Sequence, residues 1–155
     1  MSISIRLICA GEMKDVALRE LISRYASDVR CEADGAIRFK LVGCAVYLSA
    51  ARQLTKDVAK DSLSINVNIS ITCRIDKFES FDVGRSNALR FCTDALKSLG
   101  SDGVLLFGDD TPVLLRRNGA CLLRRSPNHP NDEDELVRIA KQVCTEYEFV
   151  EHLEW

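Results

Sequence analysis

The alternation of apolar and polar side chains is clearest in the stretch SINVNISITCRID, residues 64–76. Every second residue from Ile65 to Ile75 is apolar or cysteine, and the residues between them are polar. This period of two is typical of a strand with one covered face and one wet face, as in antiparallel sheets. The stretch therefore predicts one long strand. Its wet face carries almost no charge and presents Asn66, Asn68, Ser70 and Thr72.

Similar patterns divide the rest of the chain into strands and helices. Strands are predicted within 2–9, 44–50, 102–108, 111–119 and 120–126, and residues 29–41 are expected to form two short strands around Asp34-Gly35. Apolar stripes at helical spacing predict helices within 14–27, 83–100 and 128–144, and Gly100 is a suitable stop for the second. Residues 52–62 fit either a short helix or a loop. Residues 145–155 fit a short terminal strand or an ordered tail held by Trp155.

Turn residues link several of these strands into hairpins. Asn118-Gly119 and Asp34-Gly35 are the dipeptides that a type I′ turn favours. Asp109 and Asp110 lie between two apolar runs, and Pro112 follows at the start of the next strand. These two aspartates are therefore expected at the tip of a hairpin.

The elements together predict a single α+β domain over residues 1–155. We expect a mainly antiparallel sheet of about seven strands, with two or three helices packed mostly on one face. A doubly wound parallel sheet is disfavoured, because its strands would be apolar on both faces.

No pattern of residues predicts a catalytic or metal site. The seven cysteines are widely spaced without a CxxC pair, and most have apolar neighbours, so we expect buried free thiols rather than ligands or nucleophiles. Nucleotide-binding glycine motifs and a GxSxG serine are missing. Adjacent aspartates at a hairpin tip point apart, and exposure there cannot raise the pKa of either. The sequence thus predicts no enzyme, cofactor or metal.

Composition and charge indicate a soluble intracellular protein that binds other proteins. Hydrophobic residues make up 46% and charged residues 28%, and neither a leader segment nor a membrane span is evident. From Pro127 onward, eight acidic residues stand against Arg138 and Lys141, within a chain of net charge −2. This acidic end disfavours nucleic acid and favours a basic protein partner. Arg116-Arg117 and Arg124-Arg125 could bind phosphate, but no aromatic platform accompanies them.

Residues 73–123 resemble a known family. The pattern is a strand ending in Arg74, Asp76, Lys77 and Phe78, an amphipathic helix, a strand with Asp102, Val104, Leu105 and Phe107, and then Leu114 to Arg117 with Gly119. It is similar to the core of the Sit-type immunity proteins, the third family of that name. The resemblance implies a cytoplasmic protein that binds and neutralises a contact-delivered polymorphic toxin of bacteria.

An immunity role would require a binding surface and no chemistry. Acidic side chains suited to a basic toxin are the first candidates: Glu79, Asp82, Asp109, Asp110, Glu148, Glu151 and Glu154. The wet strand face with Asn66 and Asn68 is the second candidate. Two alternatives stay open, namely an adaptor or regulatory domain that binds another protein, and a small enzyme that reverses a modification made by a toxin.

Overall fold

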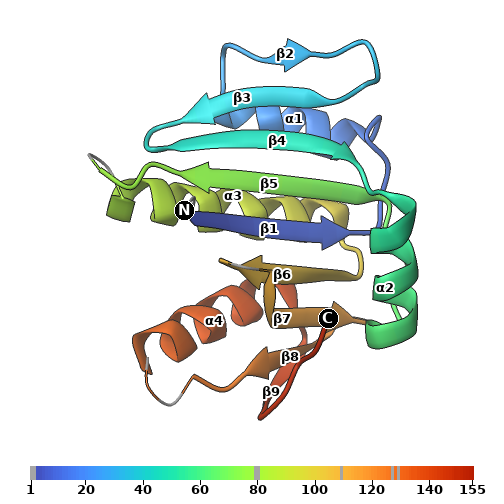
Figure 1. The fold of residues 1–155 in the computed structure, drawn as a ribbon, viewed down its shortest axis with the longest axis vertical. Coiled ribbons are helices and arrows are strands. Elements are labelled where there is room, and N and C mark those ends of the chain that lie inside the picture. The colour runs from blue at the N-terminus through green and yellow to red at the C-terminus, as the bar shows by residue number, and fades with distance from the viewer. Residues whose placement is uncertain (1–2, 79–80, 109, 127, 129) are drawn as a thin grey trace.

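One β-sheet runs through the computed structural model, which describes residues 3–78, 81–108, 110–126, 128 and 130–155 (Figure 1). The strands are β1 (Ile3–Cys9), β2 (Arg30–Cys31), β3 (Ile37–Leu41), β4 (Cys44–Ala50), β5 (Ile69–Ile75), β6 (Gly103–Phe107), β7 (Thr111–Arg117), β8 (Ala120–Arg124) and β9 (Glu146–Val150). Across the described residues these nine strands lie in the order β2-β3-β4-β5-β1-β6-β7-β8-β9. All neighbouring pairs are antiparallel except β8 and β9, which confirms the mainly antiparallel sheet.

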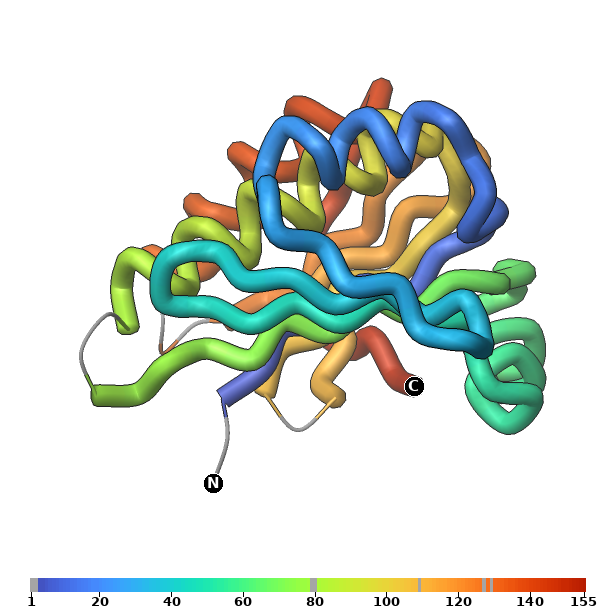
Figure 2. The backbone as a smooth tube through the Cα atoms, turned by 90° about the horizontal axis from the view of Figure 1, so that it is seen from above, coloured from blue at the N-terminus to red at the C-terminus, as the bar shows by residue number. Residues whose placement is uncertain are grey.

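Helices cover the two faces of this sheet unequally. The helices in the described ranges are α1 (Val16–Tyr25), α2 (Gln53–Leu63), α3 (Phe81–Leu99) and α4 (Pro130–Val143). Viewed from above, α1, α3 and α4 lie on one side of the sheet, while α2 and the C-terminus lie on the other (Figure 2). The prediction of helices mostly on one face is confirmed, and the undecided segment 52–62 forms a further helix.

Local sequence explains where these helices begin and end. The carboxylate of Asp15 accepts a hydrogen bond from the backbone N–H of Ala17 at 2.8 Å, which caps the start of α1. Gly100 follows α3 at φ 59°, and its N–H donates to the carbonyl of Leu96, as expected for the predicted stop. Ser64 ends α2 in the same left-handed region at φ 56°.

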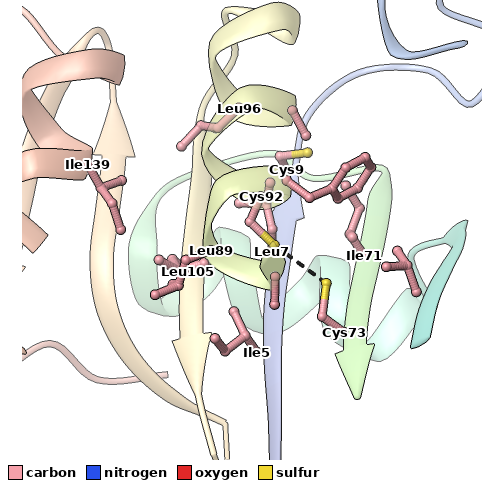
Figure 3. Close-up of a cluster of buried hydrophobic side chains, with 14 of the residues drawn as sticks. Ile5, Leu7, Cys9, Ile71, Cys73, Leu89, Cys92, Leu96, Leu105 and Ile139 are labelled. Atoms are coloured by element: carbon pink, nitrogen blue, oxygen red, sulfur yellow. Dashed lines mark hydrogen bonds between the residues drawn. The ribbon is translucent and has the colours of Figure 1, made fainter. Parts of the chain in front are cut away.

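The main core lies between the sheet and α1, α3 and α4 (Figure 3). Alternate residues of the central strands point into it, including Leu7 of β1 and Ile71 of β5, both with 0% of their surface exposed. From the helix side Phe91 packs edge-on against the rings of Tyr25 and Phe39. These contacts hold the helix layer on the sheet.

A second, smaller apolar cluster lies on the opposite face. It joins Leu63 of α2 to Ile8 of β1 and Leu106 of β6, and Leu153 near the C-terminus also belongs to it. Because α2 and the C-terminal residues cover only this part, no helix of the described residues lies over the face beside β3, β4 and β5 (Figure 1).

The prediction of one strand over 64–76 is corrected. β5 begins at Ile69, and Ile65 and Val67 pack in the second cluster, whereas Ile69 and Ile71 pack in the main core. The alternation continues unbroken through both parts, so the pattern alone cannot show that the chain changes from one cluster to the other.

Two further details of the sheet differ from expectation. The described residues form nine strands where about seven were expected; the short strand before Asp34-Gly35 is present as β2, and the C-terminal stretch that fits a strand or a tail forms the strand β9. Between β2 and β3, only Gly35 has a positive φ, so the turn is a longer loop instead of type I′. Asn118 and Gly119 have φ of 53° and 82°, which agrees with the predicted type I′ turn.

The cysteine prediction is corrected for two residues. Cys121 of β8 and Cys144, which follows α4, are joined by a disulfide with a Cα–Cα distance of 5.9 Å. The other cysteines are free, and Cys31 is the exposed one among them in the described structure. Sequence spacing could not reveal this pair, because its members meet only when α4 folds back onto β8.

Candidate binding surface

Asp110 lies at the hairpin turn where the sequence places it. It occupies the turn between β6 and β7 at φ 61°, and its carboxylate pairs with the Arg6 guanidinium of β1 at 2.7 Å. Its side chain is 46% exposed. The ion pair ties the turn to β1 and leaves Asp110 only partly available to a partner. Asp109 lies outside the described residues.

The remaining acidic candidates are spread over the molecule. Asp82 is exposed in the first turn of α3, on the helix side of the sheet, and Glu79 lies outside the described residues. Glu148 is exposed on the edge strand β9, and Glu151 and Glu154 are exposed beyond it. The structure therefore does not bring the acidic candidates together.

Asn66 and Asn68 are exposed, as predicted, but they precede β5. The backbone N–H of Asn68 donates to the carbonyl of Cys9, and its carbonyl accepts from Ala51. Ser70 and Thr72 lie within β5 and are half-buried. The predicted polar ledge is thus divided between the end of the sheet and its uncovered face.

The uncovered face of the sheet is built from alternate residues of four neighbouring strands. Strand register places Arg38, Tyr47, Thr72 and Arg6 in one row, and Lys40, Ala45, Arg74 and Ser4 in the next. We call the following set the open face: Ser4, Arg6, Arg38, Lys40, Ala45, Tyr47, Ser49, Ser70, Thr72 and Arg74. None of them is buried.

Cations dominate the open face. Arg38 pairs with Glu32 at 2.7 Å, and its guanidinium carbon lies 4.3 Å from the centre of the Tyr47 ring. Lys40 and Arg74 are exposed and make no ion pair within the described part of the chain. The sequence analysis missed this surface because each cation is a single polar position in a different strand. Only the strand order brings them together.

A groove borders the open face where α2 begins. It has a volume of about 400 Å³ and is lined by Arg6, Tyr47 and Ser70 from the sheet and by Arg52 and Leu54 from the α2 side. Leu54 is 75% exposed although it is apolar. The groove therefore combines two guanidinium groups with an apolar wall, a mixture that suits a protein side chain.

Three of the four arginines in the two pairs singled out in the sequence make contacts within the fold. Arg116 donates to the carbonyl of Ser101 at 3.0 Å, and Arg117 donates to the carbonyl of Leu63, the last residue of α2, at 2.9 Å. Arg125 pairs with Glu133 at 3.5 Å and lies over the Phe149 ring. These contacts occupy the guanidinium groups of Arg116, Arg117 and Arg125, which could otherwise bind phosphate.

The buried free thiols lie in the main core between the sheet and the helices, and those of Cys9, Cys44 and Cys73 lack the lowered pKa of a reactive cysteine. Cys73 and Cys92 approach with their sulfurs 3.8 Å apart (Figure 3). Burial raises the pKa of the Cys9 thiol to about 12, and the Cys73 thiol together with burial raises the pKa of Cys44. Protonated thiols are poor nucleophiles. The described residues also hold no group of three or more side chains suited to a metal ion.

The family of the chain follows from a comparison with known proteins. A family model described as SitI3-like matches residues 3–134. The chain belongs to the SitI3-like family. This confirms the resemblance to the third family of Sit-type immunity proteins and extends it well beyond residues 73–123. No curated protein and no solved structure matches the chain.

The SitI3-like match covers some of the candidate surfaces and not others. All four strands of the open face lie inside the matched range, as does Asp82. Glu148, Glu151 and Glu154 lie beyond it. Among the described residues, no helix has the length and apolar character needed to span a membrane.

Proposed function

We propose that this protein binds a cognate bacterial toxin and neutralises it by protein–protein contact, acting in the cytoplasm as part of a contact-dependent polymorphic toxin system. The observation that carries the proposal is the SitI3-like match over residues 3–134. The fold is consistent with such a role, because a sheet fixed by a helix layer offers a rigid backbone that needs no ordering when a partner binds.

The test is protection of cells that make the toxin. The toxin encoded beside this gene is expressed inside bacterial cells with and without this protein, and growth is followed. We expect the toxin-producing cells to grow only when they also make this protein. The protein should give no protection against a toxin from an unrelated pair. Continued killing at equal expression of the two proteins would contradict the proposal.

Calorimetric titration separates neutralisation by binding from the two alternatives. A catalytically inactive form of the same toxin should bind one-to-one, with a Kd below about 1 μM, which corresponds to roughly −8 kcal/mol. Protection without binding would favour an enzyme that reverses the toxin's modification. Neither protection nor binding would favour an adaptor with another partner.

A further inference from the structure

We infer that the open face is the surface that contacts the toxin, and that an acidic surface of the toxin docks on it; the inference rests on the proposed function. It reverses the charge expected from the sequence, where acidic residues were the first candidates and a basic partner was predicted.

The charge of the open face supports this assignment. It carries the cations Arg6, Arg38, Lys40 and Arg74, and no acidic residue is among its members. Arg6 and Arg38 are partly offset by their ion-pair partners at the rim. Lys40 and Arg74 make no ion pair within the described part of the chain, but Asp76 lines the same hollow and offsets part of their charge, so the four cations exceed the three neighbouring carboxylates by one.

The arrangement of Lys40 and Arg74 suits a carboxylate. Ala45 of β4 lies between them in register, so the Cα atoms of Lys40 and Arg74 are two strand spacings apart, roughly 10 Å, with only a methyl group between the two side chains. Asp76 follows β5 and lines the same hollow as these residues, and its carboxylate already accepts a hydrogen bond from the Phe78 N–H at 2.9 Å. A partner carboxylate placed above Ala45 could reach both cations without meeting a bulky side chain.

The same face is poorly suited to nucleic acid. Binding to single strands usually relies on aromatic rings on which bases stack. Tyr47 is the aromatic residue of the open face, and the Arg38 guanidinium covers its ring. An acidic protein surface presents separate carboxylates and needs no stacking.

The experiment compares two charge-reversed double variants. Lys40→Glu with Arg74→Glu changes the open face. Arg19→Glu with Arg138→Glu is the matched control, because both residues are exposed on the helix layer and the net charge changes equally. Binding to the inactive neighbouring toxin is measured by calorimetry, and circular dichroism with thermal melts verifies folding. The milder pair Lys40→Gln with Arg74→Gln is measured as well, in case the reversed variant unfolds.

We expect the open-face reversal to weaken binding at least tenfold and the control to change it less than threefold. Equal binding by wild type and the folded open-face variants would overturn the assigned surface but leave the proposed function intact. No binding by wild type would overturn both. The probes for other occupants are a random-sequence DNA duplex, a random-sequence RNA and the protein alone in sedimentation. Nucleic-acid binding or self-association abolished by the same substitutions would overturn the acidic toxin surface as the occupant.

Discussion

Gly84 lies where α3 approaches the turn between β3 and β4 most closely. A Cβ atom added at this residue would overlap the backbone carbonyl of Gly43. The neighbouring Asn87 donates from its amide to the carbonyl of Val42 at 2.9 Å. The hairpin that carries Arg38 and Lys40 is therefore positioned by backbone contact with the helix, with no room for a larger residue.

We predict that Gly84→Ala lowers the free energy of unfolding by about 2 kcal/mol, although alanine favours helices. The overlap with Gly43 must be relieved by moving backbone, and overpacking of this kind typically costs about 1–3 kcal/mol. Denaturant unfolding measures the change. Ser86→Ala, at an exposed position of the same helix, is the control and should stay within about 0.5 kcal/mol of wild type. An unchanged stability in Gly84→Ala would show that the close approach does not persist in solution.

The Cys9 thiol should make stability fall at high pH. Burial raises its pKa from 9.0 to about 12 in the folded protein. The folded state therefore holds a proton that the unfolded state releases above about pH 9, so this contribution is complete below about pH 9 and is lost as the pH rises toward about 12. We expect unfolding experiments between about pH 8 and pH 11 to show a steeper decline for wild type than for Cys9→Ala. Parallel curves for the two proteins would refute the role of Cys9.

At the scale of elements, helix α2 ends in an unfavourable conformation. Ser64 has φ 56°, and its N–H donates to the carbonyls of Ala59 and Lys60. The left-handed region costs a residue with a Cβ roughly 1–2 kcal/mol, and glycine avoids this cost.

Ser64→Gly should therefore raise the free energy of unfolding, by about 0.5–1 kcal/mol after the greater freedom of glycine in the unfolded chain is included. Thermal and denaturant unfolding measure this effect. Ser62→Gly, in the last turn of α2, is the matched control and should lower the free energy of unfolding by about 0.5 kcal/mol or less, since serine is itself a weaker helix former than alanine. A loss of stability in both variants would mean that Ser64 makes a contact worth more than its strain.

The disulfide between Cys121 and Cys144 fastens the end of α4 to β8. Its members are 23 residues apart, and closing a loop of this size in the unfolded chain stabilises a fold by about 3 kcal/mol in the chain-entropy model. We expect reduction, or Cys144→Ser, to lower stability by roughly that amount, measured by denaturant unfolding. Mass spectrometry after alkylation shows whether the bond is present. A pair of free thiols in the native protein would contradict it.

The sequence predicts elements well where one face is buried. The alternation in β1, β4 and β5 and the stripes of α1, α3 and α4 follow directly from residues that pack in the main core, such as Leu7 and Phe91. The two short strands predicted on either side of Asp34-Gly35 are present as β2 and β3, although β2 is only two residues long and exposed. The sequence does not reveal that the chain passes from the second cluster to the main core after Val67, because apolar residues alternate with polar ones in the same way before and after that point.

The candidate surface could be predicted only in part. Exposure of Asp82, Glu148 and Asn66 follows from their polarity, and the structure agrees. The ion pair between Asp110 and Arg6 joins residues distant in sequence, so its existence depends on β1 and β6 being neighbours. The same holds for Lys40 and Arg74, whose proximity depends on the order β3-β4-β5.

At the scale of the whole molecule, charge is separated between two regions of the sheet. The open face near β3, β4 and β5 is positive, whereas β9 and the residues after it carry Glu146, Glu148, Glu151 and Glu154. Fields of this kind orient a charged partner before contact and raise the association rate.

We therefore predict that association with the inactive toxin slows as salt is added, while dissociation changes little. Screening shortens the Debye length from about 30 Å at 0.01 M to about 3 Å at 1 M ionic strength. Stopped-flow or surface-based kinetics across this range measure both rates. The open-face reversal Lys40→Glu with Arg74→Glu should flatten the dependence, and an association rate independent of salt would contradict steering by this face.

The position of β1 also has a consequence for the timing of folding in the cell. β1 lies in the middle of the sheet, where Ile3 pairs with Ile75 on one side and Ile5 pairs with Phe107 on the other. At about 5–20 residues per second, the ribosome needs roughly 5–20 s to make the 100 or so residues between β1 and β6. We expect the first strand synthesised to wait for both partners, with no finished sheet on a nascent chain. Under the proposed function, a cell would then be guarded by the chains it completed before an attack, because those begun afterwards would fold too late for the first toxin molecules.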